Sequence, residues 1–206
     1  MIGIINFGLG NIGSIINALN KINEKCFLIN GISDFQKAEK LILPGVGSFK
    51  MGMKMLGERG FDNQIRKTVI HDKKPILGIC LGMQLFATSS EEDGLNPGLN
   101  LIKAEVKKVK YLNGFSIPHV GWNKIKQEKK NPIFNDIPDN TNFYFVHSYH
   151  LVVKEKNIII GKTTYSEDFN SIILSKNILG IQPHPEKSQF HGLKFLKNFC
   201  TSSIKE

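Results

Sequence analysis

The segment PILGICLGMQLF, residues 75–86, best indicates the fold, because it predicts a sharp turn from a buried strand into a helix. The apolar run before Cys80 predicts the strand, and the helix is expected to start near Leu81. Cys80 lies between Gly78 and Gly82, which is the spacing of a nucleophile elbow. Such a turn exposes its central side chain, and the N-terminus of the helix stabilises a thiolate there. We therefore predict that Cys80 is a nucleophile rather than a packing residue.

A nucleophile of this kind needs a general base, and the segment IQPHPEKS, residues 181–188, contains the best candidate. The prolines on both sides of His184 favour extended backbone. In an extended chain, residues two apart project to the same side, so His184 and Glu186 can face one direction. A carboxylate beside an imidazole fixes its tautomer and stabilises the imidazolium. The pattern predicts that Glu186 orients His184, and that His184 serves Cys80.

Two glycine-rich segments also follow predicted strands. LPGVGSF, residues 43–49, either brings backbone N–H groups close to a ligand or is a plain connecting loop. GLGNIG, residues 8–13, fits the G-x-G-x-x-G pattern of dinucleotide-binding proteins, and Asp34 lies near the spacing of a ribose-binding carboxylate. That match is weak alone, because glycines serve any tight strand-to-helix turn. A nucleotide-binding oxidoreductase is the alternative of a different class.

The order of apolar patterns predicts an α/β fold. Strands alternate with helices in the first half, which favours right-handed crossovers and a mostly parallel central sheet with flanking helices. These strands are predicted at 2–6, 26–30, 40–43 and 75–79, and the helices at 11–22, at about 50–70 and from residue 81. The second half favours antiparallel additions to the sheet, at 101–110, 142–153, 157–165 and 171–182, before a closing helix at 189–200. We expect one domain over residues 1–206.

Composition and charge exclude several classes of function. The net charge is +9, but lysines are scattered through every segment, so we expect a solvated surface or an acidic protein partner rather than nucleic acid. No apolar run approaches the ~20 residues of a membrane span. The three cysteines form no CxxC pair, and His147 and His150 would face opposite ways on a strand. We expect a cytoplasmic protein with no cofactor and no metal.

The segments GICLGMQ (78–84) and HPEK (184–187) together resemble the class I, triad-type glutamine amidotransferases. PGVGSF, SEE, PHVGWN and FYFVHSY narrow the resemblance to the glutaminase subunits of imidazole glycerol phosphate synthase. The resemblance extends from Ile4 to about Phe199. It implies hydrolysis of L-glutamine to glutamate and ammonia. It also implies a heterodimer with a (β/α)8-barrel cyclase subunit, which uses the ammonia to make imidazole glycerol phosphate and AICAR in histidine biosynthesis.

The resemblance also implies a role for individual residues. Cys80 would be the nucleophile, His184 the general acid and base, and Glu186 the residue that orients it. The oxyanion would be held by the N–H of Leu81 and by an N–H near Val46 and Gly47. The residues implied at the substrate are Gly45, Val46, Gly47, Leu81, Gln84, Glu92, Ser148 and Tyr149. Those implied near the partner subunit are Asn11, Trp122 and Lys187. The segment PHVGWN, which contains His119 and Trp122, is also predicted to be a surface anchor, because tryptophan is enriched at interfaces.

Three positions depart from the family pattern. Asn6-Phe7 replaces Asp-Tyr before the first glycine, and Asp93 follows SEE where glycine is common. Pro183 replaces an aromatic residue before His184, and its missing N–H is a reason to expect a shift of that histidine. A paralogue that supplies ammonia to amidate a bacterial surface sugar is the nearest alternative function. A catalytically silent regulatory subunit is another, against which the intact Cys–His–Glu set argues.

Overall fold

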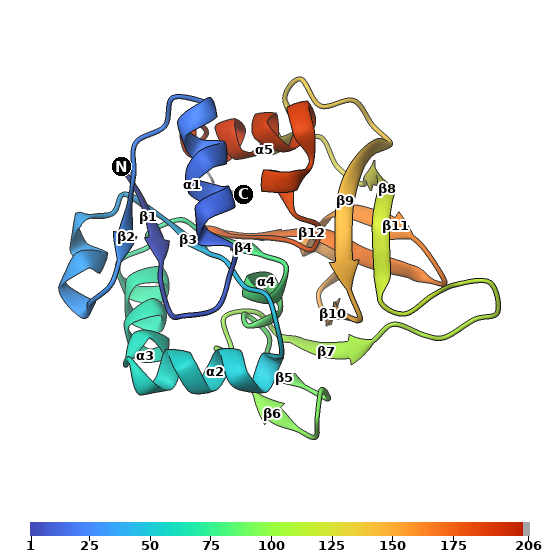
Figure 1. The fold of residues 1–206 in the computed structure, drawn as a ribbon, viewed down its shortest axis with the longest axis horizontal. Coiled ribbons are helices and arrows are strands. Elements are labelled where there is room, and N and C mark those ends of the chain that lie inside the picture. The colour runs from blue at the N-terminus through green and yellow to red at the C-terminus, as the bar shows by residue number, and fades with distance from the viewer. Residues whose placement is uncertain (204–206) are drawn as a thin grey trace.

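The structure, a computed structural model that describes residues 1–203, is built on a nine-stranded sheet (Figure 1). Its strands lie in the order β2 (Cys26–Ile29), β1 (Ile2–Ile5), β3 (Lys40–Leu43), β4 (Ile76–Ile79), β13 (Ile178–Ile181), β12 (Asp168–Ser175), β11 (Ile159–Thr164), β8 (His119–Gln127) and β9 (Thr141–His147). Strands β2 to β13 in this order are parallel, and each later strand is antiparallel to its neighbour. The predicted α/β class, with antiparallel additions in the second half, is confirmed.

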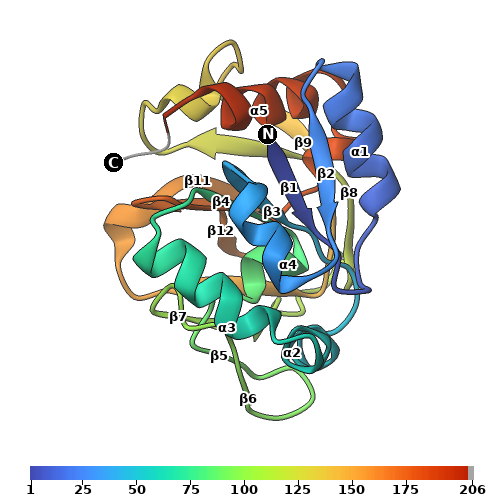
Figure 2. The same cartoon turned by 90° about the vertical axis from the view of Figure 1, so that its left-hand side faces the viewer.

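Helices cover both faces of the parallel half of the sheet (Figures 1 and 2). On one face α1 (Ile12–Lys21) packs beside α5 (Gln189–Thr201). On the other lie α2 (Phe49–Glu58), α3 (Phe61–Arg66) and α4 (Leu81–Gln84). The apolar stripe of α1 explains its placement, since Ile15 and Leu19 are buried against Phe195 and Leu196 in one of the two cores. The Asn11 side chain begins this helix by accepting the N–H of Ser14 at 3.3 Å.

Short helical turns connect the main elements. They are η1 (Ile32–Lys37), η2 (Lys67–His71), η3 (Pro132–Phe134), η4 (Lys156–Ile158) and η5 (Pro185–Lys187). The helical stretch predicted over about 50–70 is correct in extent but is not continuous, because Gly60 has a left-handed φ of +66° and separates α2 from α3. Within residues 1–203, no helix is both long and apolar enough to cross a membrane.

The run at 142–153, predicted as one strand, is divided at Ser148. Its first part is β9, which pairs with β8 in the large sheet. Its second part is β10 (Tyr149–Val153), which belongs to a smaller sheet in the order β10, β7 (Ala104–Lys108), β5 (Ser89–Ser90) and β6 (Asn96–Pro97). The Ser148 carbonyl accepts the N–H of Val109 at 2.9 Å, which ties the turn to the end of β7. Ser148 and Tyr149 are therefore held where the two sheets meet.

The strand β13 was expected among the antiparallel additions to the sheet, which is correct for only one of its two neighbours. It pairs antiparallel with β12 but parallel with β4, in the register that places Ile181 opposite Ile79. The hairpin from β12 returns the chain into the parallel half of the sheet. As a result, the segments that follow Ile79 and Ile181 lie at the same edge of the sheet.

Candidate active site

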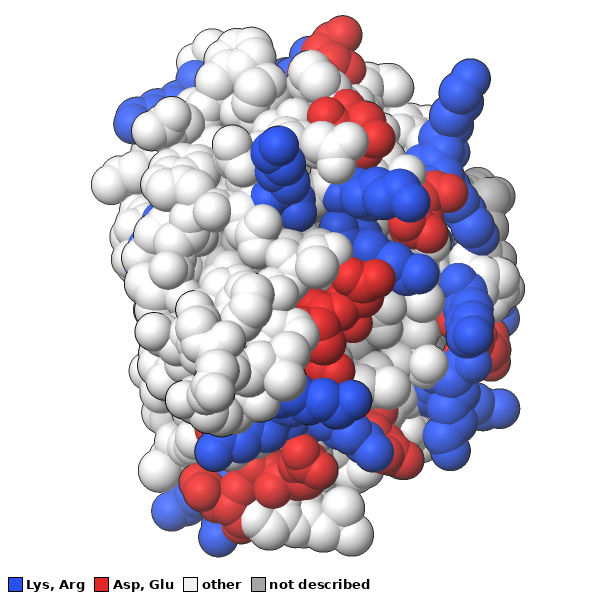
Figure 3. Space-filling view, turned by 90° about the vertical axis from the view of Figure 1, so that its right-hand side faces the viewer, with Lys and Arg blue, Asp and Glu red and all other residues white. Residues whose placement is uncertain are grey.

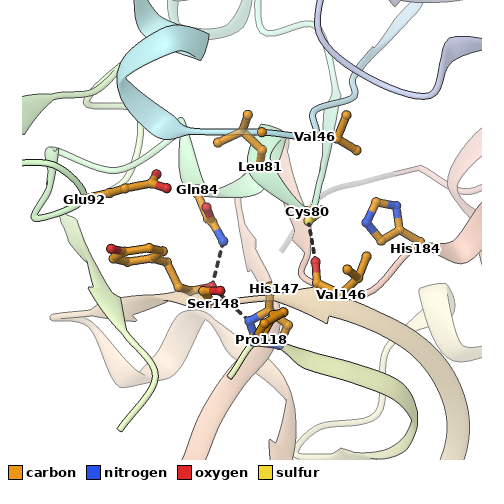
Figure 4. Close-up of a pocket in the computed structure, with 12 residues that line it drawn as sticks. Val46, Cys80, Leu81, Gln84, Glu92, Pro118, Val146, His147, Ser148 and His184 are labelled. Atoms are coloured by element: carbon orange, nitrogen blue, oxygen red, sulfur yellow. Dashed lines mark hydrogen bonds between the residues drawn. The ribbon is translucent and has the colours of Figure 1, made fainter. Parts of the chain in front are cut away.

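The candidate site lies where three neighbouring parallel strands end. The loop with Pro44 follows β3, Cys80 follows β4, and the segment from Gln182 to His184 follows β13. Ligands of open α/β sheets bind at this carboxyl edge. Here the edge opens into a cavity of about 340 Å³, into which Cys80 and His184 face (Figure 4). A cavity of this size suits a small ligand.

Cys80 has the strained backbone that the nucleophile elbow predicts, with φ of +53° and ψ of −111°. Its N–H donates to the carbonyl of Ile181 at 2.8 Å, so the turn is fastened to β13. A Cβ added to Gly82 would lie 1.9 Å from the carbonyl oxygen of Leu43, and one at Gly78 would lie 2.6 Å from the ring of Phe86. The flanking glycines are therefore required by close packing behind the turn.

His184 and Glu186 form a buried pair beside Cys80. The Nδ1 of His184 lies 2.8 Å from Oε1 of Glu186, and both side chains are at most 2% exposed. Figure 4 shows the imidazole next to Cys80, and its Nε2 has no hydrogen-bond partner among residues 1–203. Burial lowers the pKa of His184, but its interactions with the neighbouring Cys80 thiolate and with the Glu186 carboxylate outweigh burial and raise the pKa to about 10. The favoured state of His184 beside a thiolate is the imidazolium.

Pro183 does not displace this histidine from the site. The N–H of His184 donates to the carbonyl of Tyr144 at 2.9 Å, and its own carbonyl accepts the hydroxyl of Ser188 at 2.6 Å. β13 ends at Ile181, so the N–H that Pro183 lacks is not needed in the ladder. The expected shift of His184 is therefore not observed.

The loop after β3 brings its backbone N–H groups to the cavity that Cys80 faces. Val46 and Gly47 line the cavity, and Gly47 has a φ of +105°. Gly45 does not line it, but packs so closely against Leu81 that a Cβ at Gly45 would lie 2.8 Å from that of Leu81. Leu81 is the first residue of α4, so its N–H has no acceptor within the helix. These donors could hold an oxyanion beside the sulfur.

The end of the cavity away from His184 holds three polar residues expected at the substrate, Gln84, Glu92 and Ser148 (Figure 4). Tyr149, the fourth, also lines the cavity. Nε2 of Gln84 donates to the carbonyl of Tyr149 at 2.8 Å. The carboxylate of Glu92 accepts the N–H of Phe49 at 2.6 Å. Burial raises the pKa of Glu92, the bond from Phe49 lowers it, and Asp93 raises it, with a net increase.

Comparison with known proteins agrees with this geometry. The family description "Glutamine amidotransferase class-I" matches residues 3–202. The chain belongs to this family. It is 46% identical to imidazole glycerol phosphate synthase subunit HisH 2 of Methanococcus maripaludis, over 97% of this chain and 98% of that one. It is 43% identical to subunit HisH 1 of Campylobacter jejuni, over 97% and 99%. The structure of PurLQS from Thermotoga maritima has the same fold, with a TM-score of 0.71 at 18% identity over 96% of each chain.

The residues expected near a partner of this class I amidotransferase lie on adjacent elements. Asn11 precedes α1, which contacts η5; Lys187 ends η5, which contacts β9; and Trp122 lies on β8, the neighbour of β9. Tyr144 connects two of them, with its ring centroid 6.0 Å from that of Trp122 and 5.8 Å from Nζ of Lys187. Trp122 is 48% exposed. Trp122 and Lys187 therefore lie near the same ring, while Asn11 is linked to them only through the contact of α1 with η5.

His119 is not part of that surface. It is 2% exposed, and its ring stacks between those of Phe145 and Tyr165. Its Nδ1 lies 3.1 Å from Nε2 of His147, and burial lowers the pKa of His119 to about 4 and that of His147 to about 3. The two neutral rings form a hydrogen bond to each other. His150 lies on β10, after the chain leaves the large sheet at Ser148. No group of three potential metal ligands occurs within residues 1–203.

Asp34, the possible ribose-binding carboxylate of the glycine pattern, makes local contacts. The carboxylate of Asp34 accepts the N–H groups of Asn30 and Gly31, each at 3.1 Å, and binds Lys37 at 2.7 Å. It therefore caps a turn, and the nucleotide-binding alternative is not favoured. Figure 3 shows basic side chains interspersed with acidic ones over one face. That face carries no continuous basic stripe. Lysines also form ion pairs, such as that of Lys162 with Glu128 at 3.6 Å.

One polar residue in contact with the nucleophile, Gln182, was not predicted from the sequence. Gln182 is fully buried, and its Nε2 lies 3.6 Å from Sγ of Cys80. On the other side of the sulfur, the carbonyl of Val146 lies 3.8 Å from Sγ. The position of Gln182 two residues before His184 was the available signal, since both residues follow the same strand.

Proposed function

We propose that this class I amidotransferase is the glutaminase subunit of an imidazole glycerol phosphate synthase, folded as one domain. The observation that carries the proposal is Cys80, held at a positive φ at the carboxyl edge of the sheet, beside the buried pair of His184 and Glu186. Its similarity to HisH subunits of two organisms, at 46% and 43% identity, supports the assignment of substrate and pathway. L-Glutamine is the proposed substrate.

The cavity suggests how glutamine would be oriented. Both hydrogens of the Gln84 amide are used, by the Tyr149 carbonyl at 2.8 Å and by Oε1 of Gln182 at 3.1 Å. Gln84 therefore offers only its oxygen, and Glu92 offers carboxylate oxygens. The amide oxygen of Gln84 and the carboxylate of Glu92 can each accept a hydrogen bond from the α-ammonium group of an amino acid. Ser148 and Tyr149 border the same end of the cavity, where donors would face the α-carboxylate.

The first half of the proposed reaction forms a thioester. The thiolate of Cys80 attacks the side-chain amide carbon of glutamine, and the N–H groups of Leu81 and of the Val46–Gly47 loop hold the resulting oxyanion. The His184 imidazolium then donates a proton to the amide nitrogen. The C–N bond breaks, ammonia leaves, and the γ-glutamyl group remains bound to sulfur.

The second half releases glutamate. Neutral His184 takes a proton from water, and the oxygen attacks the thioester carbon. The C–S bond breaks as the second tetrahedral intermediate collapses, which restores the Cys80 thiolate and leaves glutamate. His184 is then again protonated, and Glu186 stabilises that charge in both halves.

The relatives are named as subunits, which supports a partner chain, and we propose that this partner receives the ammonia. We propose a (β/α)8-barrel cyclase subunit as that partner, with Asn11, Trp122 and Lys187 near the contact. The chain alone is expected to hydrolyse glutamine slowly. A loaded partner should increase the rate by roughly 5–150-fold, the range of ordinary allosteric coupling. Steady-state assays with and without the co-purified cyclase test this, and equal rates would contradict it. Rescue of a histidine auxotroph distinguishes this acceptor from a surface sugar.

Replacing Glu186 with glutamine should lower kcat by about a hundredfold to ten-thousandfold. The carboxylate stabilises the charged ring, so its removal lowers the pKa of His184 from about 10 toward the ordinary 6.5. The proton needed for ammonia release is then lost at lower pH, and the alkaline fall in activity should begin earlier. A pH profile of kcat measures this. Glu39→Gln, at a carboxylate 82% exposed, is the control; an unchanged profile for Glu186→Gln would contradict the assignment.

A further inference from the structure

Gln182 is a polar side chain beside Cys80 that has no role in the reaction steps proposed above. It is fully buried at the end of β13, and its backbone N–H is fixed by the carbonyl of Ser171 at 2.8 Å. The side chain extends toward Cys80, where Nε2 and Sγ are 3.6 Å apart. This is within the range of a hydrogen bond to sulfur. A buried amide is costly unless its groups are paired, so the direction in which it points has a structural cause.

The orientation of the Gln182 amide is imposed by a chain of contacts. The Tyr149 carbonyl can only accept, so Gln84 must direct its NH2 group toward it. The same NH2 group of Gln84 lies 3.1 Å from the amide of Gln182, which must therefore present its oxygen there. The nitrogen of Gln182 is left to face Cys80. His147 adds a second donor to the Tyr149 carbonyl at 2.9 Å, which holds the start of this chain in place.

The hydrogen bonds that the sulfur can form change when the thiol ionises. A neutral thiol can donate to the Val146 carbonyl at 3.8 Å. A thiolate cannot, and the same carbonyl dipole then opposes its charge. The Gln182 amide is an N–H donor that remains useful in the ionised state, and hydrogen bonds to charged groups are the stronger ones.

We propose that Gln182 is a catalytic residue that donates a hydrogen bond to the Cys80 thiolate, with Gln84 as the positioning residue that aims it. The assignment deepens the proposed glutaminase function and rests on Cys80 being its nucleophile. The bond stabilises the attacking thiolate before thioester formation, and again when the C–S bond breaks and the thiolate leaves. Gln84 thus serves both the substrate and the nucleophile.

The test measures the reactivity of the thiol itself, with iodoacetamide and without glutamine. In this reaction the sulfur displaces iodide from carbon, and mass spectrometry follows the peptide that contains Cys80. The variants are Gln182→Met, which removes the donor at similar volume, and Gln182→Glu, which keeps an acceptor for Gln84 but puts a carboxylate near the sulfur. Ser171→Ala is the matched control, because this neighbouring buried hydroxyl has no hydrogen-bond partner among residues 1–203.

At pH 7 both Gln182 variants should be alkylated about tenfold to a hundredfold more slowly than the wild type, and Ser171→Ala at the wild-type rate. The rate of Gln182→Met should rejoin the wild type in alkaline solution, where both thiols are ionised. Wild-type rates for both variants at pH 7 would overturn the proposal. So would a deficit of Gln182→Met that is equal at every pH, since that indicates a packing defect. If the expected pattern appears in a protein that does not hydrolyse glutamine, the donor role stands and the proposed function fails.

Discussion

Replacement of Cys80 by alanine or serine is expected to reduce glutamine hydrolysis by about a thousandfold or more, because no other side chain of the site can form the thioester. Serine keeps the shape of the residue but remains a neutral, poorly nucleophilic hydroxyl at neutral pH. Glutamate production in the presence of the partner subunit measures the loss. Thermal unfolding should show that both variants fold.

Cys26→Ala supplies the control for this experiment. Cys26 lies on β2, at the edge of the large sheet, and is only partly buried. Its replacement should leave glutamine hydrolysis unchanged. If Cys80→Ala keeps more than about a tenth of the wild-type rate, Cys80 is not the nucleophile, whether or not Cys26→Ala keeps its activity.

Gly82→Ala should have the largest effect on stability. The added Cβ would lie 1.9 Å from the carbonyl oxygen of Leu43, a backbone atom at the end of β3 that cannot rotate away as a flexible side chain could. We expect a loss of about 3 kcal/mol or more in the free energy of unfolding. Movement of α4 away from β3 would also separate the two sources of oxyanion donors, and a shift of about 1 Å can cost roughly a hundredfold in rate.

The matched variant is Gly57→Ala in α2, where an added Cβ meets nothing within 4 Å. Alanine there should stabilise the protein by about 0.5–1 kcal/mol, because glycine loses more conformational freedom in a helix. Denaturant unfolding of the two variants gives both values. A Gly82→Ala protein as stable as Gly57→Ala would show that β3 and α4 are not in the close contact described above.

Local patterns predicted the elements whose environment is uniform along their length. β1, β2, β3, β4, α1 and α5 all lie within one residue of their predicted ends. Strand–helix alternation is determined by nearby residues, and each of these elements buries a single continuous stripe or run. The position of Cys80 followed from the same local information, because glycines two residues before and after a cysteine at a strand-to-helix junction are typical of a nucleophile elbow.

Features that depend on distant partners were predicted less well. The run at 142–153 is rich in apolar and aromatic residues along its whole length, and only its pairing with β8 and then with β7 shows that it serves two sheets. β8 itself was not predicted, because His119, Lys124 and their neighbours alternate without a strong apolar signal. Gln182 was missed for a similar reason, since its role depends on Cys80 and Gln84, about a hundred residues away in the chain.

The left-handed backbone of Cys80 has an evolutionary consequence. A side chain at φ of +53° and ψ of −111° costs on the order of 1–3 kcal/mol, a cost that glycine at this position would not incur. A copy of this protein that no longer needed a nucleophile would gain stability by drifting from Cys80 to glycine. A cysteine at a position suited to glycine therefore has a cost in stability that a chemical role explains, which argues that this chain is catalytic rather than merely regulatory.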